Sequence, residues 1–519
     1  LLSKFASSAA HVMGKTLVSS ETGTWLKEHF QVTLADLKQL CDNLFVSGIN
    51  HHVYHGTAYS PQDAPWPGWL FYASTQLNPQ NSIWRDVGTL NEYVTRCQSL
   101  LQQGSADNDL LVYFPLHDIL QDPEHPLAGK LTIEGDWLLN LPAADTVRTI
   151  WKQGFSFDYI SDKQIIDLTE SDRKLVTPGG EYKGILVPPC DFMPVDTLEK
   201  LVHLSRNGAS ILFLDSAPKD VPGFAGLEAK RARFSELKQE ISPSEDLMEA
   251  LTSACISREP LSDMEGLRFI RRCHPNGHLY FILNEGTNSV DTWTALSVEV
   301  TDAVLMDPMT GQIGNAAFRE GRVHLQLEPG ASIFMKTNVQ TVEPWPYVEP
   351  TRQAYPVKGT WQVRFLEGGP DLPASYETGA LAPWSERGEP YEAFAGTAEV
   401  SIVFDAPEPH ASWLLDLGEV HSSVRVRLNG DEVATLIGPT FRVRLPALKP
   451  TGNRLDLEVT SLAANRIRDL DQRGVKWRIF DDINFVDMNY EPFDASDWPL
   501  TPSGLTGPAY LIRLAQTVE

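Results

Sequence analysis

The hydrophobic pattern of this chain changes near residue 260, and this change constrains its fold more than any other feature. Before that point, short apolar runs alternate with stretches that have the periodicity of amphipathic helices. After it, apolar and polar residues alternate one by one, which is typical of half-buried strands. The sequence therefore predicts a multidomain protein that is α/β in its first half and all-β in its second half.

Residues 1–105 predict two βα units. A short strand over residues 16–20 ends at Glu21, and a helix follows with apolar side chains on one face. A second strand over residues 51–55 leads into a long loop and a further helix. An eight-stranded barrel needs about 200 or more residues. We therefore expect only the last βα units of a (β/α)8 barrel here, with its other strands upstream of Leu1.

Residues 106–260 predict a separate α/β domain. They contain four short apolar runs, which begin at Leu110, Phe157, Gly184 and Ala209. Continuous apolar runs are expected of parallel strands that are covered on both faces, as in a doubly wound, flavodoxin-like sheet. Neither GxGxxG nor GxxxxGK[ST] occurs in this domain, so the sequence gives no support for a nucleotide site.

The remaining residues predict two β-sandwich domains. Residues 261–344 form the smaller one, and a Pro-rich stretch then leads into the larger one over residues 345–519. Within the larger domain, Asn429 and Gly430 lie between two alternating runs, and this dipeptide predicts a tight hairpin.

The charge and the cysteine content exclude several classes of partner. The chain has 68 Asp and Glu against 43 Lys and Arg, a net charge of -25 at pH 7, whereas nucleic acids and anionic membranes attract clustered positive charge. No apolar run reaches the ~18 residues of a membrane span. The 5 cysteines form no CxxC pair, so neither a full disulfide framework nor a zinc site is indicated. A neutral small molecule or a sugar fits this surface better.

Glu21 is the strongest candidate for a catalytic residue. It directly follows a predicted strand of a βα unit, and the active sites of barrels lie at the carboxyl ends of their strands. A carboxylate in that place is the usual acid, base or nucleophile of sugar hydrolysis. The alternative is an exposed carboxylate that caps the next helix.

His52 and His55 follow at the end of the second strand, where they are expected beside Glu21 and can hydrogen-bond a sugar. Strand alternation places His51 and His55 on one face and His52 on the other, which disfavours a three-histidine metal site. Ordinary core or surface histidines are the alternative.

The loop over residues 57–90 is rich in Pro and Trp, and its aromatic content argues against disorder. Trp66, Trp69 and Trp84 are candidates for the wall of a sugar pocket. Packing of the long loop onto the body of the protein explains them equally well.

Two further features give weaker indications. Cys190 follows a predicted strand, as the nucleophile of a hydrolase elbow would, but the flanking glycines are absent and an inert cysteine is favoured. Asp481, Asp482 and Asp487 suggest calcium, but their spacing matches no known calcium loop and an acidic turn is favoured. We expect no cofactor and no metal.

Several segments occur along the chain in a specific order. In the first domain they are KTLVSSE (15–21), TLADLK (33–38), GINHHVYHG (48–56), PGW (67–69), NSIW (81–84) and YVTRCQSLLQQG (93–104), followed by DNDLLVYFP (107–115) and FDYISD (157–162). Together they resemble glycoside hydrolase family 106, the α-L-rhamnosidases. The later segments LDLG (415–418), VRLNG (426–430), NRLDLEV (453–459) and SGLTGP (503–508) resemble the jelly-roll, sugar-binding-like domain of β-galactosidase-type hydrolases.

The resemblance implies an inverting hydrolase that removes terminal α-L-rhamnosyl residues on a (β/α)8 barrel. Inversion uses an acid and a base whose carboxyls lie about 6.5–9.5 Å apart. Glu21 would be the base, and the sugar subsite would be shaped by His52, His55, Trp69 and Trp84. The second carboxylate would come from a strand before Leu1, so the N-terminal half of the enzyme would be the missing partner of this chain. A periplasmic or secreted location is also implied.

Two other functions are compatible with the sequence. One is a non-catalytic carbohydrate-binding or accessory chain. The other is a hydrolase of a different sugar, such as a retaining relative of β-galactosidase.

Overall fold

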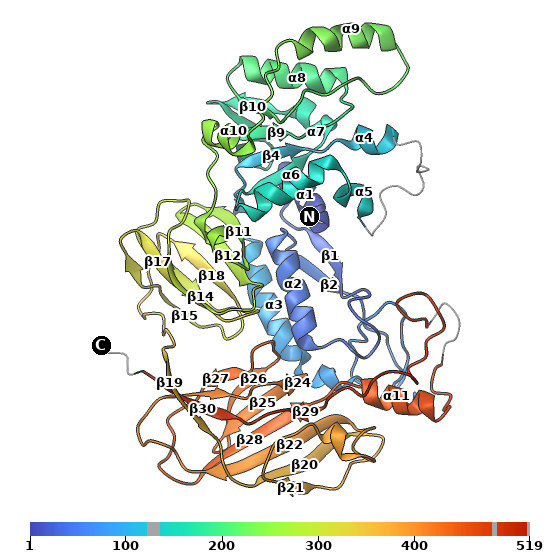
Figure 1. The fold of residues 1–519 in the computed structure, drawn as a ribbon, viewed down its shortest axis with the longest axis vertical. Helices are drawn as coiled ribbons and strands as arrows, with labels where there is room; N and C mark the ends of the chain where they lie inside the picture. Colours follow the sequence, from blue (N-terminus) through green and yellow to red (C-terminus); the bar gives the residue numbers. More distant parts are fainter. Residues whose placement is uncertain (122–134, 480–484, 516–519) are drawn as a thin grey trace.

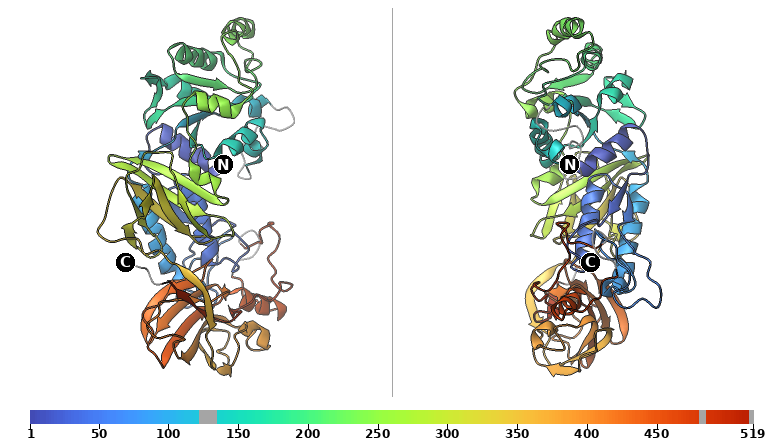
Figure 2. Two further views of the ribbon diagram at one scale, coloured as in Figure 1. Left: turned by 60° about the vertical axis from the view of Figure 1, so that its left-hand side comes forward. Right: turned by 90° about the vertical axis from the view of Figure 1, so that its right-hand side faces the viewer.

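The computed structural model describes residues 1–121, 135–479 and 485–515. Figure 1 shows an elongated molecule with the α/β domain at one end and the larger sandwich at the other. The N-terminal βα units lie between these two domains, beside the smaller sandwich, as the turned views in Figure 2 also show. No helix of the described residues is long and apolar enough to cross a membrane.

The N-terminal region forms two βα units. Its elements are α1 (Leu2–Val12), β1 (Ser19–Thr22), α2 (Leu34–Val46), β2 (His51–Tyr54), the 3-10 helix η1 (Ser82–Asp86) and α3 (Val87–Leu101). β1 and β2 pair in parallel, and within the described ranges no third strand joins them. α2 begins at a capping box in which the Thr33 hydroxyl accepts from the Asp36 N–H and the Asp36 carboxylate accepts from the Thr33 N–H.

Helices α2 and α3 form a layer between the two-stranded sheet and the smaller sandwich. Leu37 and Phe45 of α2 and Leu90 of α3 share one core with Phe281 and Phe334 of that sandwich. The helix layer therefore covers β1 and β2 from one side, as the outer helices of a barrel cover its strands.

A four-stranded parallel sheet forms the centre of the α/β domain, as the four apolar runs predict. Its strand order is β10 (Ser210–Phe213), β9 (Gly184–Val187), β4 (Leu110–Tyr113) and β5 (Phe157–Ile160). Helices lie on both faces: α8 (Val195–Arg206) and α9 (Leu227–Lys238) share one core, and α6 (Pro142–Lys152) and α10 (Leu247–Ser253) share the other. Leu111 of β4 belongs to the first core and Leu110 to the second, which makes the sheet doubly wound.

Smaller elements complete this domain. They are α4 (Leu116–Gln121), α5 (Asp136–Leu139), α7 (Asp162–Asp167) and an antiparallel meander of β6 (Thr169–Ser171), β7 (Lys174–Thr177) and β8 (Gly180–Tyr182). The meander was not predicted from the sequence, because its strands are too short to establish a period.

The smaller sandwich pairs a six-stranded sheet with a three-stranded one. The first has the order β15 (Ile313–Asn315), β14 (Ala303–Met306), β18 (Ser332–Thr337), β12 (Gly277–Asn284), β11 (Leu267–His274) and β3 (Ser105–Ala106), and the second β13 (Val290–Thr294), β17 (Arg322–Leu327) and β16 (Phe318–Arg319). Leu305 and Met335 of the first sheet and Leu325 of the second lie in one buried core.

The larger sandwich is built in the same way around the largest core of the chain. One sheet has the order β21 (Tyr376–Thr378), β20 (Trp361–Gly369), β22 (Ala395–Phe404), β28 (Asn453–Thr460), β25 (Ser423–Leu428) and β26 (Asp431–Leu436), and the other β19 (Pro350–Pro356), β30 (Tyr510–Leu514), β23 (Trp413–Asp416) and β27 (Arg442–Arg444). Asn429 and Gly430 both have positive φ and join β25 to β26, which confirms the predicted hairpin. The helix α11 (Ala464–Gln472) and the pair β24 (Val420–His421) and β29 (Gly504–Leu505) lie at its edge.

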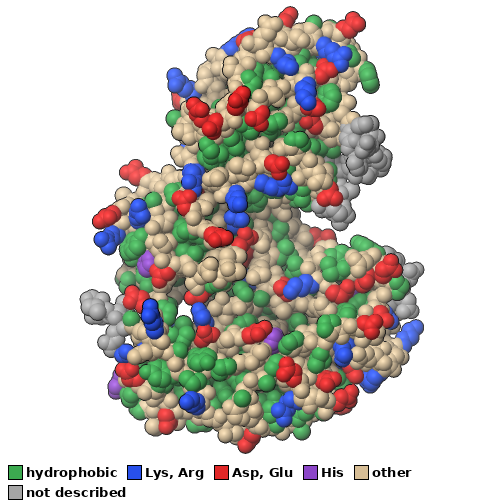
Figure 3. Space-filling model, in the orientation of Figure 1, with side chains coloured by type: hydrophobic (Ala, Val, Ile, Leu, Met, Phe, Trp, Pro, Cys, Tyr) green, Lys and Arg blue, Asp and Glu red, His purple; other side chains and the backbone are tan. Residues whose placement is uncertain are grey.

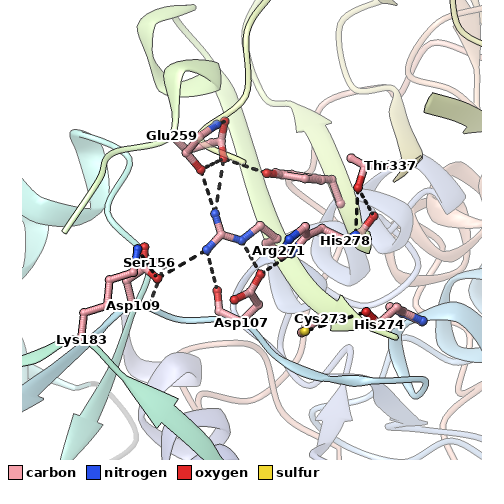
Figure 4. A network of polar contacts seen from close by, with 12 residues as sticks. Asp107, Asp109, Ser156, Lys183, Glu259, Arg271, Cys273, His274, His278 and Thr337 are labelled. Carbon is pink, nitrogen blue, oxygen red and sulfur yellow. Dashed lines mark hydrogen bonds and ion pairs between the residues drawn. The ribbon is translucent and has the colours of Figure 1, made fainter. Parts of the chain in front are cut away.

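A buried polar network joins the α/β domain to the smaller sandwich (Figure 4). Arg271 of β11 donates from Nε to Asp107 Oδ2 at 2.6 Å and lies 3.7 Å from both Asp109 and Glu259. His278 of β12 lies 2.7 Å from the same Asp107 oxygen. Burial alone would raise the pKa of Asp107, but His278 and Arg271 hold it below its ordinary value. Asp107 is therefore a carboxylate that links β11 and β12 to the segment before β4.

Candidate functional site

The two faces of the β1–β2 sheet have different surroundings. Ser20 and Thr22 of β1 and His52 of β2 lie on the face that meets the helix layer. Because strand residues alternate between faces, Glu21 and its register partner Val53 lie on the opposite face. Val53 is 54% exposed and Glu21 is also exposed. The face that would point into a barrel is therefore the bare one.

Glu21 is the one carboxylate on these two strands. Within the described part of the chain, its side chain makes no hydrogen bond and no ion pair. The carboxylate is thus free to accept a proton or a hydrogen bond from a molecule placed on the bare face. Glu21 is the third of the four residues of β1, one position before its carboxyl end, rather than directly after a strand over residues 16–20 as predicted.

His52 does not share the face of Glu21. Its Nδ1 lies 2.9 Å from Thr22 Oγ1, and its ring packs edge-on against Phe45 of α2 at 4.7 Å. Burial lowers the pKa of His52 to about 4, so the ring is neutral at ordinary pH. These contacts make His52 part of the packing between strand and helix.

His55 lies just beyond the end of β2 and faces the loops. Its Nδ1 is 2.8 Å from Thr24 Oγ1, which follows β1, and its ring packs edge-on against Phe71 at 5.1 Å. His55 therefore connects the loops that follow the two strands, a few residues from Glu21.

The three tryptophans of the long loop lie in different places. The side chain of Trp69 is 40% exposed, and the backbone N–H of Trp69 donates to Ser60 Oγ within the loop. Trp66 packs under the guanidinium of Arg466 of α11, at 3.7 Å. Trp84 lies on η1, next to Arg85, which pairs with Glu367 and Glu458 of the larger sandwich. Trp66 thus contacts the larger sandwich, and Trp84 lies beside a residue that does.

A segment of the larger sandwich, residues 485–493, reaches the loops after β1 and β2. Figure 1 shows a red segment of the larger sandwich beside the blue loops below these strands. His29 is fully buried between them: its Nε2 donates to the Val486 carbonyl at 3.0 Å, its Nδ1 accepts from Gln76 at 3.1 Å, and its ring stacks on Phe485 at 4.4 Å. No local sequence pattern indicates this segment, because the contact joins residues more than 450 positions apart.

Neither of the weaker candidates gains support. Cys190 is buried, and burial raises the pKa of its thiol, which keeps it protonated and unreactive. Asp487 accepts the backbone N–H groups of Asn489 and Glu491, whereas Asp481 and Asp482 lie outside the described residues. Among the residues that are described, no group of three or more His, Cys, Asp or Glu is arranged to hold a metal ion.

The surface is hollowed on the side where β1 and β2 lie. Figure 3 shows this hollow between the α/β domain and the loops of the lower part of the molecule. In Figure 1, β1 and β2 lie beside this hollow. The arrangement thus combines an accessible carboxylate, a concave surface and aromatic loops.

Comparison with known proteins gives a structural and a sequence relative. A rhamnosidase from Novosphingobium sp. PP1Y has a similar structure, with a TM-score of 0.74 at 24% identity, over 98% of this chain and 49% of that one. A Formosa agariphila protein provisionally named beta-glucuronidase is 28% identical over 296 residues, which are 54% of this chain and 23% of that protein. The chain therefore spans at most about half the length of these relatives.

The family comparison covers the N-terminal units, the α/β domain and most of the smaller sandwich. The family model described as alpha-L-rhamnosidase matches residues 3–320. This match includes Glu21, both βα units and the loops that surround them. The chain belongs to glycoside hydrolase family 106, the alpha-L-rhamnosidase family.

Proposed function

We propose that this chain is the C-terminal part of an inverting α-L-rhamnosidase, with Glu21 as the general base. One observation carries the proposal: Glu21 is an unpaired carboxylate one residue before the carboxyl end of a parallel strand, on the face away from the helices. In a complete barrel, that face points to the interior and that strand end points to the active site.

The chemistry follows from what a carboxylate can do there. Glu21 takes a proton from a water molecule, which attacks the anomeric carbon while a second carboxylic acid protonates the leaving oxygen. The two carboxyls must lie about 6.5–9.5 Å apart to leave room for the water. Since β1 and β2 hold no other carboxylate, we assign the acid to a strand that pairs along the open edge of this sheet.

The neighbouring residues receive two kinds of role. His55 and Trp69, on the loops at the strand ends, contact the sugar. His52 and Trp84 act through position: His52 fixes β1 against α2 through Thr22, and Trp84 belongs to the helical turn that docks on the larger sandwich. This assignment narrows the sugar subsite that the sequence predicted.

The test is Glu21→Gln in the complete enzyme, assayed on an aryl α-L-rhamnoside. Glutamine keeps the size of the side chain but accepts no proton from water, so we expect kcat to fall by about 100-fold or more. The matched control is Glu377→Gln, an exposed strand glutamate of the larger sandwich, which should leave kcat unchanged. Activity of the Glu21 variant within about threefold of wild type would show that Glu21 is not the base.

The anomer of the first product, followed by NMR, tests the stereochemistry separately. Inversion releases β-L-rhamnose from an α-L-rhamnoside, whereas a retaining enzyme releases the α anomer. Retention would replace the role of base by that of nucleophile or acid–base residue and would favour the retaining alternative.

A further inference from the structure

Four aromatic side chains lie directly beyond the carboxyl ends of β1 and β2. We call these four residues the aromatic platform; they are Trp25, Phe71, Tyr72 and Tyr490. Ring centroids are 5.0 Å apart for Phe71 and Tyr72, 6.5 Å for Trp25 and Tyr72, and 5.9 Å for Trp25 and Tyr490. The platform begins four residues after Glu21 in the loop that follows β1, and Phe71 contacts His55 at the end of β2. It therefore borders the proposed active site.

Much of the platform is open to water. Tyr490 is 55% exposed and Phe71 is 42% exposed. Neighbouring rings kept at the surface form the kind of apolar area that marks a binding site rather than a core. Trp25 Nε1 donates to the Tyr490 hydroxyl at 3.3 Å, which leaves that hydroxyl able to donate a hydrogen bond to a ligand.

Hydrogen bonds between the segments that carry the aromatic platform hold it in place. His29 and Gln76 join the loop after β1, the loop after β2 and the segment of residues 485–493. Gln76 Nε2 also donates to the Phe71 carbonyl at 2.7 Å. Glu28 accepts the N–H of Met488 at 3.1 Å, two residues before Tyr490. Such anchoring presents the rings to a ligand with little loss of side-chain entropy on binding.

The backbone beneath two of the rings is strained. Trp25 has a φ of 43° and Tyr490 a φ of 62°, in a region that residues with a side chain rarely adopt. Strain of this kind persists where the surroundings fix it, and it is frequent at ligand sites. Among the four residues of the platform, the two with positive φ are Trp25 and Tyr490, which meet across the domain boundary.

We propose that the aromatic platform is the subsite for the leaving group, the sugar or aryl ring on the far side of the bond that is cleaved. This inference rests on the proposed function. The rhamnosyl ring must sit at Glu21 itself, whereas the platform lies farther out, on loops and on a segment of the larger sandwich. Aromatic faces pack well on the C–H groups of a pyranose or on an aryl ring, and the neutral platform suits a neutral sugar.

The larger sandwich then has a direct role in substrate selection. It supplies Tyr490 to the site, although its strands lie far from β1 and β2 along the chain. Substrates with a large leaving group contact the platform, and substrates with a very small one do not.

The experiment compares two substrates in the complete enzyme, an α-L-rhamnosyl disaccharide and α-L-rhamnosyl fluoride. Tyr490→Ala should lower kcat/KM for the disaccharide about tenfold and leave that for the fluoride within about twofold. Tyr490→Phe keeps the ring and should retain most of the disaccharide activity. Phe224→Ala removes an aromatic ring that is 94% exposed on the α/β domain, and it should change neither value.

The outcomes separate this inference from the proposed function. Equal losses on both substrates, or no loss on either, would overturn the subsite. If the wild-type enzyme cleaves neither substrate, the rhamnosidase proposal fails, and the platform is judged by saturation-transfer NMR of the disaccharide with the 519-residue chain. Weaker transfer in the Tyr490→Ala variant supports the platform in that case, and unchanged transfer rejects it.

Discussion

At the scale of single residues, His29 shows how one buried side chain can organise a site. Both of its ring nitrogens are used, one as a donor to the Val486 carbonyl and one as an acceptor from Gln76. Only the neutral ring can make both bonds. Burial lowers the pKa of His29 to about 4, which matches this requirement.

Acid should therefore loosen the loops that His29 joins. Its pKa is about 4 in the folded protein and 6.5 unfolded, so the unfolded chain binds an extra proton between these values and stability falls as the pH drops from 6.5 towards 4. The loss from this one group is on the order of 3 kcal/mol. His29→Gln keeps a donor and an acceptor but does not titrate, and its unfolding midpoint should depend less on pH in this range.

Thermal unfolding at pH 7 and pH 5 measures this difference. His203→Gln, at an exposed position on α8, is the matched control and should show the acid sensitivity of the wild type. Equal acid sensitivity of His29→Gln and wild type would exclude His29 as the responsible group.

The residues of the site show where prediction from sequence ends. The location of Glu21 near the carboxyl end of a strand and the alternation of His51 and His52 follow from local pattern, and the register of β1 and β2 agrees with both. The side of the sheet that the helices cover does not follow from that pattern, so His52 was predicted in the subsite but contacts α2. Tyr490 was missed because it meets Trp25 across 465 positions of sequence.

At the scale of elements, the strands can be predicted from local sequence pattern, whereas the contacts that join them cannot. The apolar runs of β4, β5, β9 and β10 predict a parallel sheet, as is typical of strands covered on both faces. All residues of β4, β5 and β9 are buried, whereas β10, at one edge of the sheet, is mostly half-buried. The contact between Arg271 of β11 and Asp107 spans 164 positions, and no local pattern indicates it. Long-range polar contacts therefore fix how the predicted elements are placed.

Arg271→Met should destabilise the junction between the α/β domain and the smaller sandwich. The side chain of Arg271 is 6% exposed, and its removal leaves Asp107 and Glu259 buried with less compensation. Breaking a buried pair from one side costs about 3–5 kcal/mol. Arg271→Lys keeps the charge but loses the forked geometry of the guanidinium. Its free energy of unfolding should lie between those of Arg271→Met and the wild type.

Denaturant unfolding followed by circular dichroism measures the effect. Arg268→Met removes another arginine of β11 that is 39% exposed and pairs with Glu285, so it should cost less than about 1 kcal/mol. Similar losses for the two methionine variants would show that the network in Figure 4 adds nothing specific to the junction.

At the scale of the whole molecule, the two-stranded sheet of β1 and β2 leaves one of its faces uncovered. Parallel sheets are normally covered on both faces, but among the residues that the structure describes only the helix layer covers β1 and β2. In Figures 1 and 3, the sheet lies beside the hollow in the surface. A barrel completed by further strands would cover that face and bring a second carboxylate to Glu21.

Val53→Asp tests this completion directly. Val53 is 54% exposed here, so a charge should change the stability of the 519-residue chain by less than about 0.5 kcal/mol. In a complete barrel, the same side chain enters a packed interior, where an unpaired charge costs several kcal/mol. Val403→Asp, on β22 of the larger sandwich and 61% exposed, should be mild in both proteins. Unfolding midpoints of the four variants decide the question. A large drop confined to Val53→Asp in the complete enzyme supports the barrel, whereas an equally small effect in both proteins would show that other strands do not cover this face.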